Sequence, residues 1–184
     1  MNHIQRSQAD VAETQPGRIL IVDDQEVLRF LLRRELTALG HAVDEVPDGP
    51  TALHMLRQHA FDIVLLDIMM PGMDGIQVLN HIKSDPDLYD LPVIVVSADI
   101  DHVVTCIRNG ADDYVFRPYN IVLLNARINA SLERKRLCDR ERRYRLELER
   151  MVAERTADLE RSQEALRLSE ERYALAARGA NDGL

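Results

Sequence analysis

Residues 61–75 read FDIVLLDIMMPGMDG, and this stretch decides the fold. It begins as a run of apolar and β-branched residues, which is typical of a strand that is buried on both faces. The run ends in an acid, Asp67, and a loop that contains Pro71, Gly72 and Gly75 follows at once. A buried strand that ends in a carboxylate, next to a constrained loop, indicates a functional site at the strand end.

Four further short runs have the composition of strands and alternate with helical patterns. The five expected strands are 18–22, 42–46, 61–66, 92–97 and 113–116. Apolar residues recur at helical spacing between them, as in the stripe at 27–39 and in the stripe of Val103, Val104 and Ile107. Strands that alternate with helices predict an α/β fold with a parallel sheet covered on both faces. In such folds the functional crevice lies at the carboxyl ends of the strands.

A long helix is expected from residue 121 to about 178, because no Pro or Gly interrupts this segment. Asn120 is a suitable N-cap, and such a helix would be roughly 85–90 Å long. Apolar residues recur at sevens, which predicts a parallel dimeric coiled coil with a register shift near 144–152. The predicted dimer seam consists of Leu148, Val152, Leu159, Leu166 and Tyr173. The alternative is a single solvated helix with i,i+4 ion pairs such as Glu141–Arg145.

Charge and composition exclude several classes of protein. The formal net charge is −8, with a balance of −10 over residues 1–119 and +2 over 120–184. This acidic body argues against nucleic acid as a direct ligand. No apolar run approaches the roughly 20 residues that span a bilayer, so we expect no contact with a membrane.

Cysteine and histidine give little sign of a metal or disulfide framework. Cys106 and Cys138 lack the spacing of metal ligands or of a disulfide scaffold, which favours a reducing, cytoplasmic location. The six histidines show no ligand spacing, and we expect all of them on the surface.

Chemically competent side chains follow four of the five expected strands. They are Asp23 and Asp24 after the first strand, Asp67 and Ser97 at the third and fourth, and Arg117-Pro118 after the fifth. Carboxylates that meet in one crevice repel each other, and a hard divalent cation such as Mg²⁺ relieves this repulsion. A carboxylate held beside such an ion can attack phosphorus and form an acyl phosphate. The hydroxyl of Ser97 can then hydrogen-bond the transferred group.

Residues 18–130 resemble the receiver domain of response regulators in two-component signalling. The resemblance rests on four blocks: IVDDQE at 21–26, LLDIMMPGMDG at 65–75, VVSAD at 95–99 and GADDYVFRPY at 110–119. All four occur in order at the expected strand ends, which makes the set highly specific. The resemblance implies a flavodoxin-like (βα)5 fold with a five-stranded parallel sheet, whose last helix here extends into the C-terminal coiled coil.

The resemblance also implies residue roles around the acids. Asp67 would be phosphorylated by a partner histidine kinase or phosphotransfer protein. Asp23, Asp24 and Asp67, with the backbone carbonyl of Met69, would bind Mg²⁺. No enzymatic activity beyond accepting the phosphoryl group is expected of this chain.

The fourth and fifth strands would carry the switch. By resemblance, Ser97 binds the phosphoryl group and Tyr114 swings inward, while the bond before Pro118 is cis. The chain departs from the family at Arg117, where the family has a lysine, and the two residues are not interchangeable. Arg117 could clamp a phosphoryl oxygen, or it could pair with Asp67 and weaken the switch.

The domain organisation follows from these patterns. We expect a flexible leader over 1–17, a receiver domain over 18–130 and a coiled-coil signalling helix over 131–178. Residues 179–184 would begin a further segment, since SEERYALAARGANDGL resembles the entry into a PAS sensor domain. By family habit the output beyond it would be a domain such as one for cyclic-di-GMP turnover.

Other functions remain open or are disfavoured by single positions. A pseudo-receiver that serves as a dimerising scaffold stays open, because Arg117 replaces the lysine. An aspartyl-nucleophile Mg²⁺ phosphatase would need a second acid two residues after Asp67, where this chain has Met69. A flavin binder would need a phosphate loop in place of VDDQE, and a phosphotransfer helix would need a histidine after His102.

Overall fold

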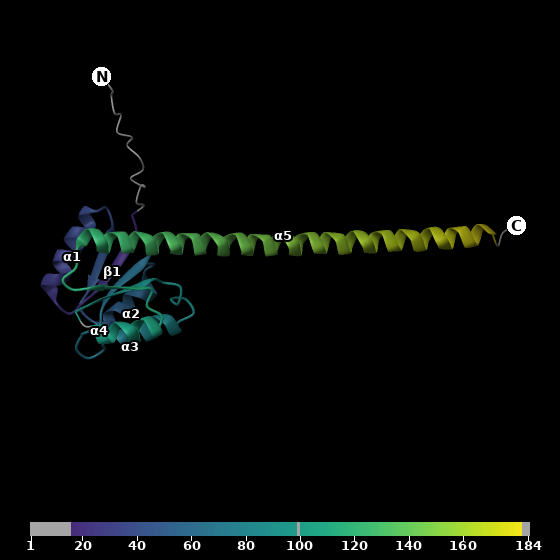
Figure 1. Ribbon diagram of the computed structural model, residues 1–184. Helices are drawn as coiled ribbons and strands as arrows, with labels where there is room; N and C mark the ends of the chain where they lie inside the picture. The colour runs from purple at the N-terminus through teal and green to yellow at the C-terminus, as the bar shows by residue number, and fades with distance from the viewer. Residues whose placement is uncertain (1–15, 99, 182–184) are drawn as a thin grey trace, which may run out of the picture. The chain divides into compact units, whose positions relative to one another are not determined.

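The computed structural model describes residues 16–98 and 100–181. Five strands alternate with five helices along the chain (Figure 1). The strands are β1 (Arg18–Val22), β2 (Ala42–Val46), β3 (Ile63–Asp67), β4 (Val93–Ser97) and β5 (Asp113–Phe116). The helices are α1 (Glu26–Ala38), α2 (Gly49–Gln58), α3 (Gly75–Ser84), α4 (Ile100–Arg108) and α5 (Ile121–Asn181). The alternation predicted from the sequence is confirmed.

Two strands begin later than the sequence pattern predicts. β3 begins at Ile63, since Asp62 accepts a hydrogen bond from the backbone N–H of Arg18 (2.8 Å) through its side chain. β4 begins at Val93, because Pro92 has no N–H to donate to the ladder and contributes only its carbonyl, to Val64 (2.9 Å). Both changes leave the functional ends of the strands in place.

All strand pairs are parallel, in the order β2-β1-β3-β4-β5. This is the flavodoxin-like order, so the predicted fold class is confirmed. The chain direction across the sheet reverses between β1 and β3. Ligands of such folds bind at the carboxyl ends of the strands beside this switch point.

Two apolar layers cover the sheet, since side chains alternate between its faces along each strand. Leu20 and Val22 of β1 pack with α2, α3 and α4, whereas Ile19 and Ile21 pack with α1 and the first turns of α5. Figure 1 shows these two groups of helices on opposite faces of the sheet. The buried β3 side chains follow the same alternation, which fixes the strand and therefore Asp67 at its end.

The buried stripes on two helices are narrower than predicted. On α1 only Leu32 and Leu36 are buried, while Val27 is 69% exposed. On α4, Val103 of the predicted stripe is buried, whereas Val104 and Ile107 are exposed. The reason is geometric, because a helix that packs on one face of a sheet buries only the residues directed at that face.

Histidine 41 corrects the expectation that every histidine lies on the surface. It is buried, and its Nδ1 accepts a hydrogen bond from the backbone N–H of Gly17 (3.2 Å). Its Nε2 lies 3.0 Å from Oδ1 of Asn125 on α5. The neutral ring with its proton on Nε2 satisfies both contacts, which is how a polar ring is buried here.

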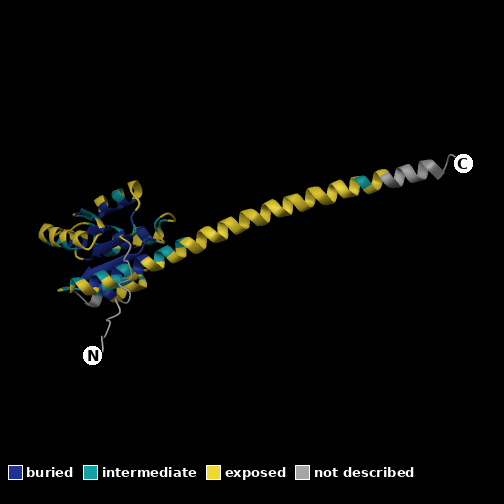
Figure 2. Cartoon of the chain, turned by 90° about the horizontal axis from the view of Figure 1, so that it is seen from above, coloured by how far each residue is buried: buried dark blue, intermediate teal, exposed yellow. Residues whose placement is uncertain are grey.

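Helix α5 begins where the sequence predicts. The side chain of Asn120 accepts from the backbone N–H of Val122 (2.8 Å), which confirms the N-cap. The chain divides into two units, Met1–Arg136 and Leu137–Leu184. Within the first unit α5 buries Leu124, Ile128 and Leu132 against the sheet. Figure 2 shows how α5 changes from buried and intermediate residues to exposed ones along its length.

The described residues of the second unit are helical, and their described side chains are almost all exposed. The exposed apolar residues include Leu148, Val152, Leu159 and Leu166 of the predicted seam. The side chain of Tyr173 lies outside the described part of the chain. No helix among the described residues is both long and apolar enough to cross a membrane.

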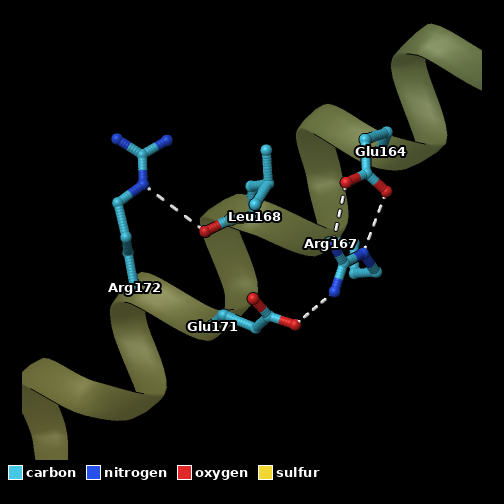
Figure 3. A network of polar contacts seen from close by, with 5 residues as sticks. All are labelled: Glu164, Arg167, Leu168, Glu171 and Arg172. Atoms are coloured by element: carbon cyan, nitrogen blue, oxygen red, sulfur yellow. Dashed lines mark hydrogen bonds and ion pairs between the residues drawn. The ribbon is translucent and has the colours of Figure 1, made fainter.

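Ion pairs one turn apart run along this part of α5. Arg145 pairs with Glu141 at 3.1 Å, as the single-helix alternative predicted. Arg167 contacts Glu164 at 2.7 Å and Glu171 at 2.5 Å, so one guanidinium joins two turns of the helix (Figure 3). Solvent screens such exposed pairs, so they add little to the stability of an isolated helix.

Candidate functional site

Three carboxylates meet at the carboxyl ends of β1 and β3. Asp23 and Asp24 follow β1 directly and Asp67 ends β3, and each offers an oxygen within 4.8 Å of the other two. Asp23 and Asp67 are buried, while Asp24 is exposed. The strands are neighbours in the sheet, so the fold itself brings the three acids together, as the sequence predicted.

Hydrogen bonds of its side chain and of its backbone hold Asp23 in place. Its Oδ1 accepts from the backbone N–H of Gln25 (2.8 Å), and its own N–H donates to the carbonyl of Val46 (3.3 Å). Its backbone carbonyl accepts from Nη1 of Arg29 on α1 (2.6 Å). Neither Gln25 nor Arg29 was predicted, and no residue pattern in the sequence marks them, because both act through backbone groups of this turn.

Arg117 reaches into the acidic cluster from the end of β5. Its Nη2 forms an ion pair with Oδ2 of Asp23, and its Nη1 lies 3.5 Å from Oδ2 of Asp67. Its backbone N–H donates to the carbonyl of Ser97 (2.9 Å). The Arg117–Pro118 bond is cis, as predicted. The shorter of the two carboxylate contacts is with Asp23, whereas the sequence had suggested Asp67.

The carboxyl group of Asp67 is buried, and one of its oxygens lacks a hydrogen-bond partner. Burial raises the pKa of its carboxyl and Asp23 adds to the rise, while Arg117 and the backbone N–H groups of Met69 and Ile68 oppose it. Its Oδ2 is buried without a hydrogen-bond partner. A buried carboxylate oxygen in this state costs free energy unless a cation or another donor reaches it.

The three acids therefore fit a hard divalent cation such as Mg²⁺. Oxygen ligands in a cluster of this size are the donor set that Mg²⁺ prefers, with water and phosphate oxygens completing its shell. Asp67 Oδ2 is the oxygen that most requires such a partner. The predicted role of the Met69 carbonyl stays a prediction; the Met69 side chain itself is exposed.

The loop after β3 is shaped by glycine at two positions. Gly72 has a φ of 79°, a left-handed backbone conformation that residues other than glycine rarely adopt. A Cβ on Gly75 would lie 2.1 Å from the carbonyl oxygen of Asp67, so α3 can begin this close to the end of β3 only with a glycine. Asp74 caps the same helix by accepting from the N–H of Gln77 (2.8 Å).

The predicted switch residues lie on β4 and β5. Ser97 is buried at the end of β4, opposite Phe116 in the register of the sheet. Tyr114 is half-buried and meets Phe116 edge to face, with ring centroids 5.2 Å apart. The guanidinium of Arg127 on α5 lies 5.9 Å from the Tyr114 ring. This contact with α5 was not predicted, since it depends on how the helix packs.

Comparisons with known proteins agree with this geometry. Residues 19–129 match the family model described as the response regulator receiver domain. The chain is 42% identical over 132 residues to the response regulator PleD of Caulobacter vibrioides, covering 70% of this chain and 29% of that protein. It is 40% identical over 119 residues to the probable transcriptional regulator ycf27 of Guillardia theta, covering 64% of this chain and 46% of the relative. The chain thus spans less than half of either relative.

Solved structures give the same result. NtrX from Brucella abortus superposes with a TM-score of 0.64 at 31% identity, covering 68% of this chain and 29% of that one. The signal receiver domain of a histidine kinase from Syntrophus aciditrophicus gives 0.60 at 32% identity, covering 64% and 90%. With its parallel sheet, its cluster of acids at the switch point and the family match over residues 19–129, this chain belongs to the response regulator receiver domain family of two-component signalling.

Proposed function

We propose that this chain is a phosphorylation-controlled receiver in which Asp67 accepts a phosphoryl group from a partner histidine kinase or phosphotransfer protein. The observation that carries the proposal is the meeting of Asp23, Asp24 and Asp67 within 4.8 Å at the switch point of the sheet. Receiver domains bind Mg²⁺ at such a pocket and are phosphorylated by these partners. A cytoplasmic location belongs to the same proposal.

The chemistry follows from the positions of the side chains. The carboxylate of Asp67 would attack the phosphorus of a phosphohistidine, so that an O–P bond forms, the N–P bond breaks and the electron pair returns to the imidazole nitrogen. When bound to the three acids, Mg²⁺ supplies positive charge that offsets the charge of the phosphoryl oxygens. Asp67 needs little rearrangement for this role, because burial of β3 fixes its position.

Two further residues would bind the transferred group. The hydroxyl of Ser97 lies at the end of the neighbouring strand, where it could hydrogen-bond a phosphoryl oxygen. The guanidinium of Arg117 already lies 3.5 Å from Oδ2 of Asp67 and could pair with a second oxygen. Movement of Ser97 toward the group would free space for Tyr114, and would change the surface of β4 and β5.

The signal would leave through α5 as a change in a homodimeric coiled coil. Four described seam residues are exposed in the single chain, which supports a second copy as their partner. The contact of Arg127 with Tyr114 at 5.9 Å and its ion pair with Asp113 at 2.5 Å link α5 to the switch strand. A change at Tyr114 would therefore act on the base of the same helix that carries the seam. The following PAS-like segment and the cyclic-di-GMP output stay predictions.

A scaffold without phosphorylation is the second candidate, and one observation favours it. Arg117 pairs with Asp23 inside the pocket, where a permanent ion pair would oppose metal binding and phosphoryl transfer. The phosphatase alternative has no such support, because Met69 stands where that chemistry needs an acid.

Intact-mass measurement after incubation with acetyl phosphate separates these functions. Wild-type protein with Mg²⁺ is expected to gain the mass of one phosphoryl group, whereas the same mixture with a chelator and the Asp67→Asn variant are expected to gain none. Unchanged wild-type mass in a folded protein would support the scaffold. Equal labelling of Asp67→Asn would rule out Asp67 as the acceptor.

A further inference from the structure

The position of Arg117 has a consequence for metal binding that goes beyond its suggested contact with phosphate. We propose that Arg117 is a resident cation of the acidic pocket, which competes with Mg²⁺ for Asp23 and so sets the metal affinity of this receiver. The inference rests on the proposed function, since it concerns the same pocket. In the metal-free protein Arg117 occupies Asp23, and a metal ion binds there only as the guanidinium withdraws.

The first support is the state of the Asp23 carboxylate. Oδ1 accepts the N–H of Gln25 at 2.8 Å, and Oδ2 is taken by Nη2 of Arg117. Both oxygens therefore already have donors, unlike Oδ2 of Asp67, which is buried without a hydrogen-bond partner. A metal that uses Asp23 as a ligand must displace a charge-assisted hydrogen bond, whereas at Oδ2 of Asp67 it meets only the longer 3.5 Å contact with Nη1 of Arg117.

Electrostatic repulsion would separate a metal ion from the guanidinium of Arg117 at Asp23. A divalent ion and a guanidinium on the same carboxylate would stand only a few ångströms apart, and like charges at about 4 Å repel strongly where water is largely excluded. The Arg117 side chain is only 18% exposed and Asp23 is buried, so solvent screens this repulsion weakly. Two cations therefore do not share Asp23 at low cost.

The third support is the shape of the arginine side chain. Nη2 reaches Asp23 while Nη1 lies 3.5 Å from Asp67, so one planar group spans two of the three acids. Nε of Arg117 is buried and makes no hydrogen bond, which leaves the two terminal nitrogens as the groups that bind. A lysine ammonium is a single point charge on a flexible stem and cannot span both acids in this way.

The neighbouring arginine does not share this role. Nη1 of Arg29 donates to the backbone carbonyl of Asp23 at 2.6 Å and not to its carboxylate. Arg117 is therefore the group to alter, and its replacement leaves the turn at Asp23 supported by Arg29 and by the N–H of Gln25.

Binding of Mn²⁺, followed by the loss of its free electron paramagnetic resonance signal, tests the competition on the full chain. We expect Arg117→Met to bind Mn²⁺ about tenfold more tightly than wild type, the factor that corresponds to losing one charge-assisted hydrogen bond. Arg117→Lys should fall between the two. Arg18→Lys is the matched control, because Arg18 pairs with Asp44 on β2, and it should bind as wild type does.

Thermal unfolding gives a second readout that a merely structural role would not reproduce. Without metal, Arg117→Met is expected to unfold at a lower temperature than wild type, because its three carboxylates have lost their counter-charge. Added Mg²⁺ is expected to raise the midpoint of Arg117→Met more than that of wild type. Arg117→Lys keeps the test valid if Arg117→Met does not fold.

The outcomes separate this inference from the proposed function. Equal Mn²⁺ affinity in wild type, Arg117→Lys and Arg117→Met, with Asp24→Asn weaker than all three, would overturn the competition and leave the metal pocket standing. Mn²⁺ binding that is absent from every protein, or unchanged in Asp24→Asn, would overturn the pocket and the competition together.

Discussion

Replacing Gly75 by alanine is expected to damage both the stability and the phosphorylation of the receiver. A Cβ at this position would lie 2.1 Å from the carbonyl oxygen of Asp67 and 2.7 Å from Cα of Ile68. Both atoms belong to the backbone and cannot rotate away. The start of α3 must therefore move from the end of β3 by about 1 Å or more, since non-bonded carbon and oxygen atoms need roughly 3.3–3.6 Å.

The size of the effect follows from the contacts that this movement disturbs. Overpacking of a well-packed site costs about 1–3 kcal/mol. The hydrogen bond from the N–H of Gly75 to the carbonyl of Ile68, 2.9 Å long, would weaken and cost about 1 kcal/mol more. Alanine recovers up to about 1 kcal/mol through its helix propensity. We expect a net loss of about 2 kcal/mol and slower labelling of the displaced Asp67.

Urea unfolding followed by tyrosine fluorescence measures the loss, and Gly49→Ala is the matched control. Gly49 is also the first residue of a helix capped by an aspartate, Asp48. A Cβ there would meet the side chains of Val78 and Met73, which can shift, and not a backbone. Gly49→Ala should therefore cost less than Gly75→Ala. Equal losses in the two variants, or normal stability and labelling of Gly75→Ala, would refute the argument from close approach.

Three further outcomes are expected. Lys83→Met should lower the free energy of unfolding in urea by about 2–3 kcal/mol. The reason is that Nζ of Lys83 donates to the carbonyl of Leu91 and to Asp112, both at 2.9 Å. An unchanged midpoint would contradict this. The hydrogen bond from the Thr51 N–H lowers the pKa of Asp48 below its usual 3.8. The ionised Asp48 therefore stabilises the folded protein above pH 3.8, and this contribution is lost as the pH falls through the lowered pKa. Asp48→Asn should flatten this acid limb in unfolding measured across pH, and an unaltered slope would count against it. Leu166→Asn should weaken dimerisation in sedimentation experiments while the off-seam control Leu168→Asn does not; equal effects would argue against the seam.

The acids of the site were predictable because each one lies at the end of a strand or within two residues of it. In a parallel sheet the strand ends meet at one edge, so Asp23, Asp24 and Asp67 had to lie close together once the strands were recognised. The N-cap at Asn120 was predictable for a similar reason, since its hydrogen bond closes within three residues. The sequence therefore predicts these positions from short-range patterns and from the regular order of a parallel sheet.

The contacts that were missed depend on residues distant in the sequence. His41 is buried because Gly17, 24 residues away, and Asn125, 84 residues away, satisfy its ring. A pairing of Arg117 with Asp67 was one of the two alternatives, and its approach from β5 brings it closer to Asp23. No periodicity or motif encodes such distances, since they depend on how complete elements pack.

Mapping of the phosphorylated residue tests whether Asp67 is the phosphoryl acceptor. The chain would be incubated with acetyl phosphate and Mg²⁺, the acyl phosphate reduced with borohydride to a stable alcohol, and the modified residue identified by peptide mass spectrometry. We expect modification at Asp67 alone, and none after incubation with a chelator. Modification at another residue, or no modification of a folded protein that binds Mn²⁺, would contradict this expectation.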